Sequence, residues 1–284
     1  MDRLRQFLKK VIAVITQPEM RVLPGQLAFF FVVSLIPLVA LIGTIFSSFS
    51  ISIDSLTSTL SSAIPKEAAT VLVKLISGKS MNFNIAIFFI SAFILASNGA
   101  HSMIIASNEI YKIEAASWIR RRIKAVLMTF VLVVLLLFLL LVPVFGGSIF
   151  TLLREYATNQ NAVQFFYKVY CILKYPVSLL LVYFNIKLLY VMAPDKKIPS
   201  SSTTYGAIFT TVSWIIATEI YSFYVAKFTT YDIFYGSVAN ILILLLWVYL
   251  LAYIFVLGMA FNASNIFVYG NKDEKNTDKI EKDE

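Results

Sequence analysis

The stretch FYGSVANILILLLWVYLLAYIFVLGMAFNAS, residues 234–264, decides the fold of this chain. It contains no charged side chain, and it carries the polar residue Asn240 inside an otherwise apolar run. The hydrocarbon core of a bilayer is about 30 Å thick and is crossed by about 20 apolar residues in helical form. We therefore expect residues 234–264 to form a membrane-spanning helix.

The composition of the whole chain also indicates a membrane protein. Of its 284 residues, 59% are hydrophobic and 14% are charged, and the mean hydropathy is +0.80. A soluble domain carries about 25% charged residues, so this composition predicts an integral membrane protein. A net charge of +8 can indicate a nucleic-acid partner. Here, however, the basic residues follow the predicted membrane topology, and we expect no nucleic-acid binding.

The predicted fold class is all-α, a polytopic membrane protein with six transmembrane helices in one domain, residues 25–264. The predicted spans are about 25–49, 84–106, 125–152, 169–193, 204–228 and 234–264. Residues 50–83 are too polar to span and predict amphipathic helices in an extracellular loop. Residues 271–284 are polar except for Ile280, so we expect a disordered tail.

Residues 1–17 predict an amphipathic helix on the cytoplasmic side. Such a helix can lie in the headgroup plane and attract anionic lipids, or it can pack on the protein's own loops. Its apolar residues recur with helical spacing, and its basic residues lie off that stripe: Leu4, Phe7, Leu8, Val11, Ile12 and Ile15, against Arg3, Arg5, Lys9 and Lys10.

The distribution of basic residues predicts the orientation. In the predicted topology, sixteen Lys and Arg residues lie on the same side of the membrane as the N-terminus. Six lie on the opposite side, and two fall within the fourth span. Because cytoplasmic loops are enriched in Lys and Arg, both termini are expected in the cytoplasm of a bacterial cell, with the spans in its cytoplasmic membrane.

Glu219 is the one acidic residue inside a predicted span. Lys174 in the fourth span and Asn240 in the sixth are expected at similar depth, since Glu219 lies about 14 Å and the others about 8 Å from the outer helix ends. The Lys stem can close this difference, so we predict a Glu219–Lys174 pair with Asn240 nearby. Two interpretations stay open: a substrate- or proton-handling site, and a structural ion pair that locks two helices.

Further polar residues at membrane depth are candidates for lining a cavity, because polar groups in spans usually face the protein interior. His101, the single histidine, could act in a proton relay or lie at a helix interface with a backbone partner. The other candidates are Ser34, Ser91, Asn98, Ser178, Asn185 and Thr218.

Several catalytic signatures are missing from the sequence. One histidine and one cysteine cannot build a His-rich or Cys-rich metal centre. No GxxxxGK[ST], GxSxG or HExxH motif occurs. We therefore expect no cofactor, no metal and no enzymatic activity.

Three stretches of the sequence form a recognisable pattern. The first is LPGQLAFF with SLIPL, residues 23–30 and 34–38; the second is Asn108-Glu109-Ile110-Tyr111; and the third runs from Tyr235-Gly236-Ser237 through LLWVY to Gly258 and Asn262-Ala263. Together with Pro194 and Tyr205-Gly206-Ala207 near the start of the fifth span, these stretches resemble the YihY/virulence factor BrkB family, once labelled ribonuclease BN. The resemblance covers residues 20–264 in the family's order.

The resemblance implies six spans in the bacterial inner membrane and a transport-like role in the envelope. The chain departs from the family at Ala260, where a glutamate usually precedes Leu-Asn-Ala. The leading hypothesis is a transporter or flippase-like protein that moves a lipid or amphiphile through a polar intramembrane cavity. The alternatives are a non-transporting envelope scaffold and, as a third, an enzyme acting on RNA. A homo-oligomer is left open.

Overall fold

The computed structural model describes the backbone of residues 16, 18–48, 64–77, 85–156, 160–228 and 236–280, and side chains within 20–37, 64–71, 90–137, 164–227 and 236–264. Within these residues the chain is all-helical, without strands. The elements are α2 (Glu19–Ser48), α4 (Lys66–Ser77), α5 (Ile85–Ile110), α6 (Trp118–Tyr156), α7 (Gln160–Met192), α8 (Thr204–Phe228), the 3-10 turn η1 (Gly236–Val238) and α10 (Ala239–Ile280).

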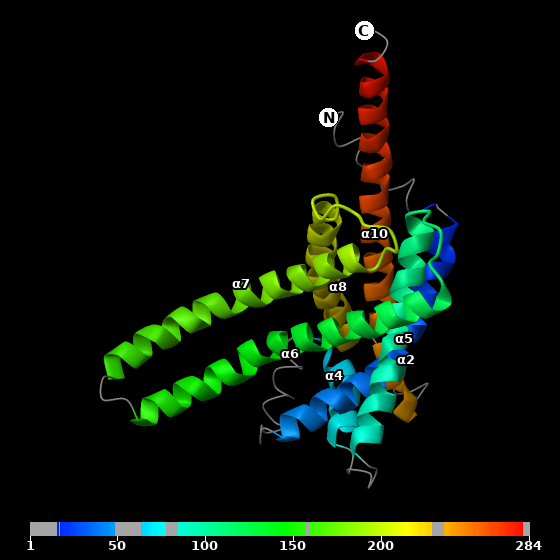
Figure 1. Ribbon diagram of the computed structural model, residues 1–284. Coiled ribbons are helices and arrows are strands. Elements are labelled where there is room, and N and C mark those ends of the chain that lie inside the picture. Colours follow the sequence, from blue (N-terminus) through cyan, green and yellow to red (C-terminus); the bar gives the residue numbers. More distant parts are fainter. Residues whose placement is uncertain are drawn as a thin grey trace.

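The centre of the fold is a bundle in which α10 packs against α2 and α8, and α2 packs against α5 (Figure 1). The largest fully buried side chains come from these helices and from the end of α7, including Leu27, Ile104, Tyr190 and Phe255. The rings of Tyr190 and Phe255 pack against each other with centroids 4.8 Å apart and their planes tilted by 42°. The sequence stretch that identifies the protein as a membrane protein therefore also supplies the middle of its core.

Small residues allow α2 and α5 to approach closely. Ala92, Ala96 and Ala100 recur every fourth residue along α5 and are all buried, as a small-xxx-small stripe predicts. Gly99 lies beside them, and a Cβ there would stand 2.9 Å from Ser34 Oγ of α2. The backbone N–H of Gly99 donates a hydrogen bond to that same oxygen at 2.9 Å.

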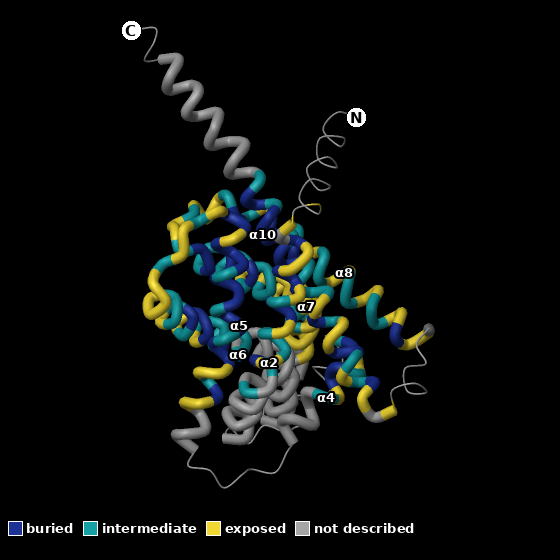
Figure 2. The backbone as a smooth tube through the Cα atoms, turned by 90° about the vertical axis from the view of Figure 1, so that its right-hand side faces the viewer, coloured by how far each residue is buried: buried dark blue, intermediate teal, exposed yellow. Residues whose placement is uncertain are grey.

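The helices α6 and α7 form an antiparallel hairpin that leaves the bundle sideways (Figure 1). Buried residues make up 6% of the apolar stretch of α7 and 17% of that of α8, compared with 56% for α5. Figure 2 shows the same contrast, with buried residues along the central helices and exposed ones along α7 and α8. The outer helices thus present most of their apolar side chains to their surroundings.

Four helices in the described part of the chain are long and apolar enough to cross a membrane: Ile90–Ile110, Gln164–Met192, Thr204–Lys227 and Ala239–Ser264. A shorter apolar stretch covers Met20–Leu35 of α2. The middle of α6 has no described side chains. The count of six spans, and the cytoplasmic placement of both termini, therefore remain predictions.

Several predicted boundaries differ from the structure. The first span begins at Glu19, so Pro24 lies inside α2 and not at its first position. One of the two amphipathic helices expected within 50–83 is α4, and the remainder of that loop lies outside the described residues. The amphipathic helix expected at 1–17 lies outside them as well.

The tail expected to be disordered begins as a continuation of α10, which extends to Ile280. A helix that is already formed adds residues at little cost, because only its first turn must be nucleated. The polar composition of the tail did not reveal this continuation.

Candidate functional site

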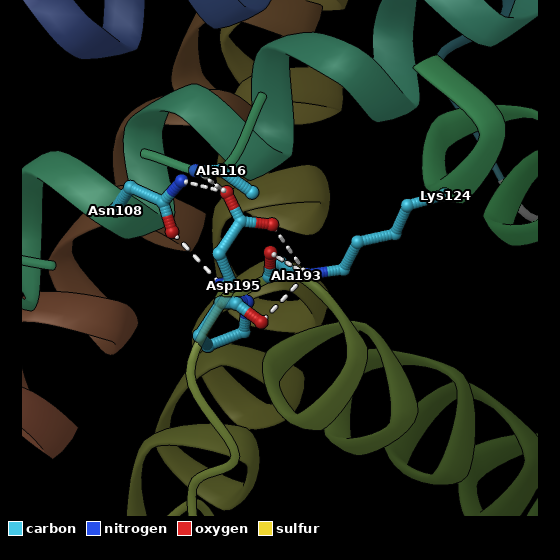
Figure 3. A network of polar contacts seen from close by, with 6 residues as sticks. Asn108, Ala116, Lys124, Ala193 and Asp195 are labelled. Atoms are coloured by element: carbon cyan, nitrogen blue, oxygen red, sulfur yellow. Dashed lines mark hydrogen bonds and ion pairs between the residues drawn. The ribbon is translucent and has the colours of Figure 1, made fainter. Parts of the chain in front are cut away.

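A polar cluster joins three chain segments at one end of the bundle (Figure 3). Its centre is Asp195, in the connection between α7 and α8. Asp195 Oδ2 accepts hydrogen bonds from Asn108 Nδ2 of α5 at 2.7 Å and from the N–H of Ala116 at 3.1 Å. Asn108 Oδ1 in turn accepts the N–H of Asp195 at 2.9 Å. The α5–α6 and α7–α8 connections are thereby fixed to each other.

Lys124, on the first turns of α6, completes the cluster. Its Nζ lies 3.0 Å from Asp195 Oδ1 and donates to the carbonyl oxygens of Ala193 at 2.9 Å and Pro194 at 2.6 Å. These three contacts use the three donors of the ammonium group. The side chains of Lys124 and Asp195 are 24% and 6% exposed, so this pair holds the connections together and has no donor left for a ligand.

The environment of Asp195 keeps it ionised. Burial by itself would raise the pKa of this carboxyl. The hydrogen bonds from Asn108, Ala116 and Lys124, together with the Lys124 charge, outweigh burial and hold the pKa below its ordinary value.

A pocket of about 750 Å³ opens beside this cluster. Its walls come from the α5–α6 connection, the start of α6 and the connection between α7 and α8. Four basic residues line it, Lys112, Arg120, Lys196 and Lys197, together with two acidic ones, Glu114 and Asp195. Because Asp195 is already paired with Lys124, the pocket carries a clear excess of positive charge. We call it the basic pocket.

Lys112 enters the basic pocket from a strained backbone position. Its φ of 53° is the one positive value at a residue other than glycine within the described chain. The N–H of Ile113 bonds the carbonyl of Asn108 at 2.8 Å, and that of Lys112 bonds Glu109 at 3.2 Å. These are the bonds of a Schellman cap, whose left-handed position usually holds glycine. A lysine here costs conformational energy, and such strain concentrates at functional sites.

An apolar hollow of about 560 Å³ lies next to the basic pocket on the face of α6. Its lining includes Ile119, Ile123 and Leu127, whose side chains are largely exposed. Arg120 lines both the hollow and the basic pocket. A cationic recess and an apolar surface therefore meet at one side chain.

A second polar group, Asn262 of α10, joins α10 to the start of α8. Asn262 is fully buried, and its Oδ1 accepts the N–H of Gly206 at 2.7 Å. Its Nδ2 donates to the carbonyl of Thr203 at 3.4 Å. Gly206 is required here, because a Cβ would overlap Asn262 and the carbonyl of Gly258.

Tyr190 joins α7 to the same two helices. Its hydroxyl donates to the carbonyl of Phe255 at 2.8 Å and lies 2.7 Å from Thr210 Oγ1. A Cβ at Gly258 would overlap both hydroxyl groups. The α7–α8–α10 junction is thus a closely packed seam whose polar side chains are buried and hydrogen-bonded to one another.

The predicted Glu219–Lys174 pair is not formed, which corrects the sequence-based expectation. Glu219 lies on an exposed face of α8, and Lys174 Nζ lies 5.9 Å from the ring centroid of Tyr175 on its own helix. The physical reason is the course of α7, which leaves the bundle sideways in the α6–α7 hairpin (Figure 1). Asn240 is half-buried near the start of α10.

The other cavity candidates are dispersed. Ser34 is buried and accepts the Gly99 N–H, while Asn98 Oδ1 accepts Arg122 Nη1 at 2.9 Å. Thr218 accepts the indole N–H of Trp247 at 3.3 Å. Asn185 donates to the carbonyl of Leu181 in its own helix at 2.8 Å, Ser178 is half-buried on α7, and Ser91 is exposed on α5. The described bonds of Ser34, Asn98 and Thr218 belong to three different helix pairs, and that of Asn185 lies within α7. A cavity lined by these residues stays a prediction.

His101 lies on α5 within the electrostatic reach of Arg121, Arg122 and Asp195. Its Nδ1 is buried without a hydrogen-bond partner in the structure, as is Nε of Arg121. The expected backbone partner is therefore not found at Nδ1, and the proton-relay interpretation stays a prediction.

The residues that form the cluster were not predicted as site residues. Asn108 and Pro194 stood out in the sequence only as motif positions, and Lys124 only as one member of a basic loop. One signal was available: Asp195 lies two residues past the end of a predicted span, where an acid at the end of an apolar helix often pairs with a basic residue of a neighbouring segment. Within the described residues, no group of three or more His, Cys, Asp or Glu side chains is arranged to hold a metal ion.

Comparison with known proteins assigns this architecture to a family. The family model described as virulence factor BrkB matches residues 11–281. The Bacillus subtilis (strain 168) protein YfkH, named as ribonuclease-like, is 31% identical over 262 residues, which cover 90% of this chain and 94% of that protein.

Other relatives carry only a membrane-protein name. A UPF0761 membrane protein of Vibrio atlanticus (strain LGP32) is 25% identical over 270 residues, covering 91% of this chain and 82% of that protein. A UPF0761 membrane protein of Haemophilus influenzae (strain 86-028NP) is 29% identical over 99 residues, covering 35% and 36%. No solved structure matches the chain.

Proposed function

Because the chain belongs to the virulence factor BrkB family of membrane proteins, we propose that it binds a lipid or another amphiphile and moves it across the bacterial cytoplasmic membrane. The proposed role is that of a flippase-like transporter and not that of an enzyme.

The observation that carries the proposal is the contact between the basic pocket and the apolar hollow through Arg120. An amphiphile with an anionic head and an apolar tail presents the matching pair of surfaces. Lys and Arg bind phosphate-like groups through charge-assisted hydrogen bonds, and exposed apolar side chains accept acyl chains. The site lies at the end of helices that are long and apolar enough to span a bilayer.

The geometry moves the proposed binding site away from the middle of the bundle. The sequence suggested a polar cavity around Glu219, but the α7–α8–α10 seam is closed by Tyr190, Thr210 and Asn262. Entry at the basic pocket and passage along the lipid-facing side of the hairpin are compatible with this closed core, because only the headgroup needs polar contacts.

A proteoliposome assay tests the proposal. The full-length protein is reconstituted into vesicles with fluorescent phosphatidylglycerol, and the loss of inner-leaflet label after addition of a membrane-impermeant quencher is followed. We expect faster movement than in protein-free vesicles. We expect movement to slow about tenfold in Lys196→Ala/Lys197→Ala, because two of the four cations are lost.

The matched control is Lys168→Ala, which removes an exposed cation on α7 outside the basic pocket. If the native protein moves phosphatidylglycerol no faster than empty vesicles do, lipid movement is not its function with this probe. Tight binding without movement would favour the envelope-scaffold alternative.

The proposal predicts no ribonuclease activity, although one relative is named as ribonuclease-like. Purified protein incubated with labelled RNA should leave it intact. Cleavage that co-elutes with the folded protein through two separate columns would contradict the non-enzymatic assignment.

A further inference from the structure

The exposed face of α8 carries one charge in the middle of an apolar stripe. Glu219 and its apolar neighbours recur every three or four residues on this face. The apolar members are largely exposed: Ile208, Val212, Ile215, Ile216, Ile220, Phe223 and Tyr224. An ionised carboxylate on a helix that spans a bilayer is expected to face protein and not acyl chains. We call Glu219 and these apolar residues the α8 stripe. Because it contains a carboxylate, the α8 stripe is unsuited to face acyl chains.

The α6–α7 hairpin carries the complementary charge. The sequence of α7 contains three lysines and no acidic residue. Lys174 lies among exposed apolar residues such as Ile172 and Leu173, and its Nζ contacts the Tyr175 ring. The hairpin projects away from its own bundle (Figure 1). Within the described residues of one chain, Lys174 and Glu219 do not form an ion pair.

We propose that a second copy of this chain covers the α8 stripe, with its projecting hairpin placing the partner's Lys174 against Glu219. In a two-fold symmetric dimer the same contact occurs twice, because each copy supplies one hairpin and one stripe. The pairing buries the two exposed apolar surfaces together and neutralises a carboxylate at membrane depth. It does not depend on the lipid-transport proposal.

Charge and topology favour a second copy over another occupant. A lipid tail would leave the carboxylate unpaired. A lipid headgroup lies at the membrane surface, whereas Glu219 is about 14 Å from the end of α8 at 1.5 Å per residue. The partner surface needs a cation embedded in an apolar helix, and α7 has this composition.

Cysteine cross-linking in membranes tests the contact. The native Cys171 is exposed on α7, three residues before Lys174. The predicted spans of α7 and α8 run in opposite directions, so a residue after Glu219 lies on the same side of the pair as Cys171. A second cysteine is therefore introduced by Phe223→Cys on the α8 stripe, four residues after Glu219. Mild oxidation should yield a reducible dimer in Phe223→Cys, and its yield should fall to background when Cys171→Ser is added.

The matched control is Ile90→Cys on α5, whose side chain is 62% exposed but lies outside the stripe. A dimer yield no higher than that of Ile90→Cys would overturn the proposal. A disulfide within one monomer would overturn it too, because it would place the hairpin on its own α8.

Charge reversal tests the specific pair in the same assay. Glu219→Lys and Lys174→Glu should each lower the dimer yield by about tenfold, because two like charges then meet at the contact. The double reversal should restore the yield, whereas Lys168→Glu should not lower it. Equal yields in all four variants would show that Lys174 and Glu219 do not meet. The Phe223→Cys result stands even if one reversed variant fails to fold.

Discussion

Asp195 concentrates the polar interactions of the described structure in one side chain. It joins α5 through Asn108, the α5–α6 connection through Ala116, and α6 through Lys124. Because its side chain is only 6% exposed, water cannot replace these partners. The residue therefore fixes the geometry of the adjacent basic pocket, although it offers no free donor or acceptor pair of its own.

Asp195→Asn should destabilise the folded protein by about 2–4 kcal/mol, because it leaves the Lys124 ammonium without its counter-charge. The measurement is thermal unfolding of the purified protein in detergent. The control is Glu114→Gln, which removes an exposed acid from the same pocket. Equal unfolding temperatures for both variants would show that the cluster does not support the fold.

The lowered pKa of Asp195 predicts the pH range in which the cluster contributes. A carboxyl with a lowered pKa binds its proton less tightly in the folded state than in the unfolded state. Its stabilisation is therefore complete above the ordinary Asp value, near pH 4, and is lost as pH falls through the lower folded value.

The native protein should consequently be more stable than Asp195→Asn at neutral pH, and the difference should shrink below about pH 4. Unfolding temperatures of both proteins, measured from pH 7 to pH 3, test this. A difference that stays constant over the whole range would show that Asp195 is not the group responsible.

Substitution of Lys112 should change the stability of the fold and the binding of anionic lipid in opposite directions. Its left-handed backbone at φ 53° favours glycine, so Lys112→Gly should stabilise the fold by about 1 kcal/mol. The same change removes a cation from the basic pocket and should weaken the binding of anionic lipid vesicles. Lys112→Asn, which tolerates this backbone, should weaken binding similarly. A Lys112→Gly protein that is less stable than the native one would contradict the cap assignment.

At the residue scale, the sequence could predict which polar residues lie within spans, but it could not predict which residues they contact. A lone Glu in a span suggests burial, yet whether Glu219 faces its own bundle depends on the course of α7, which no local pattern encodes. The Asn108–Asp195–Lys124 cluster joins residues that are 71 to 87 positions apart. Such contacts follow from helix packing, which spacing along one helix cannot predict.

At the scale of elements, the seam between α8 and α10 depends on the absence of side chains at two glycines. The bond from Gly206 to Asn262 and the bond from Trp214 Nε1 to the carbonyl of Leu251, at 2.9 Å, hold the two helices together. Helix association inside a bilayer relies on such close approach and on hydrogen bonds, because lipid tails are as apolar as the helices.

Gly206→Ala should destabilise the protein by about 2 kcal/mol or more, because its Cβ overlaps Asn262 and the backbone carbonyl of Gly258. Gly25→Ala is the matched control, since the nearest atom to its Cβ would be Tyr249 Cε2 at 4.0 Å. It should be neutral or slightly stabilising. Unfolding of both variants in detergent measures the difference, and an unaffected Gly206→Ala protein would refute the close approach.

The helices themselves were predictable because long apolar runs encode them directly. The predicted span 204–228 coincides with α8, the predicted span 125–152 lies within α6, and the predicted span 84–106 lies within α5 except for its first residue. Helix ends were less predictable. The first span was expected from about residue 25, but α2 begins at Glu19.

At the scale of the whole molecule, a compact bundle carries a projecting hairpin (Figure 1). The basic pocket lies where the α5–α6 and α7–α8 connections meet. Hydropathy could predict membrane insertion, because it depends on composition alone. It could not predict that the polar centre lies at the end of the bundle, because that position results from the meeting of two connections.

The most direct test of this account measures lipid binding at the basic pocket. Native mass spectrometry compares phosphatidylglycerol and phosphatidylcholine bound to the purified protein and to Lys196→Ala/Lys197→Ala, with Lys168→Ala as control. We predict that the native protein and Lys168→Ala prefer phosphatidylglycerol by about tenfold, and that the double variant loses this preference. Equal binding of both lipids to the native protein, or an unchanged preference in the double variant, would contradict the account.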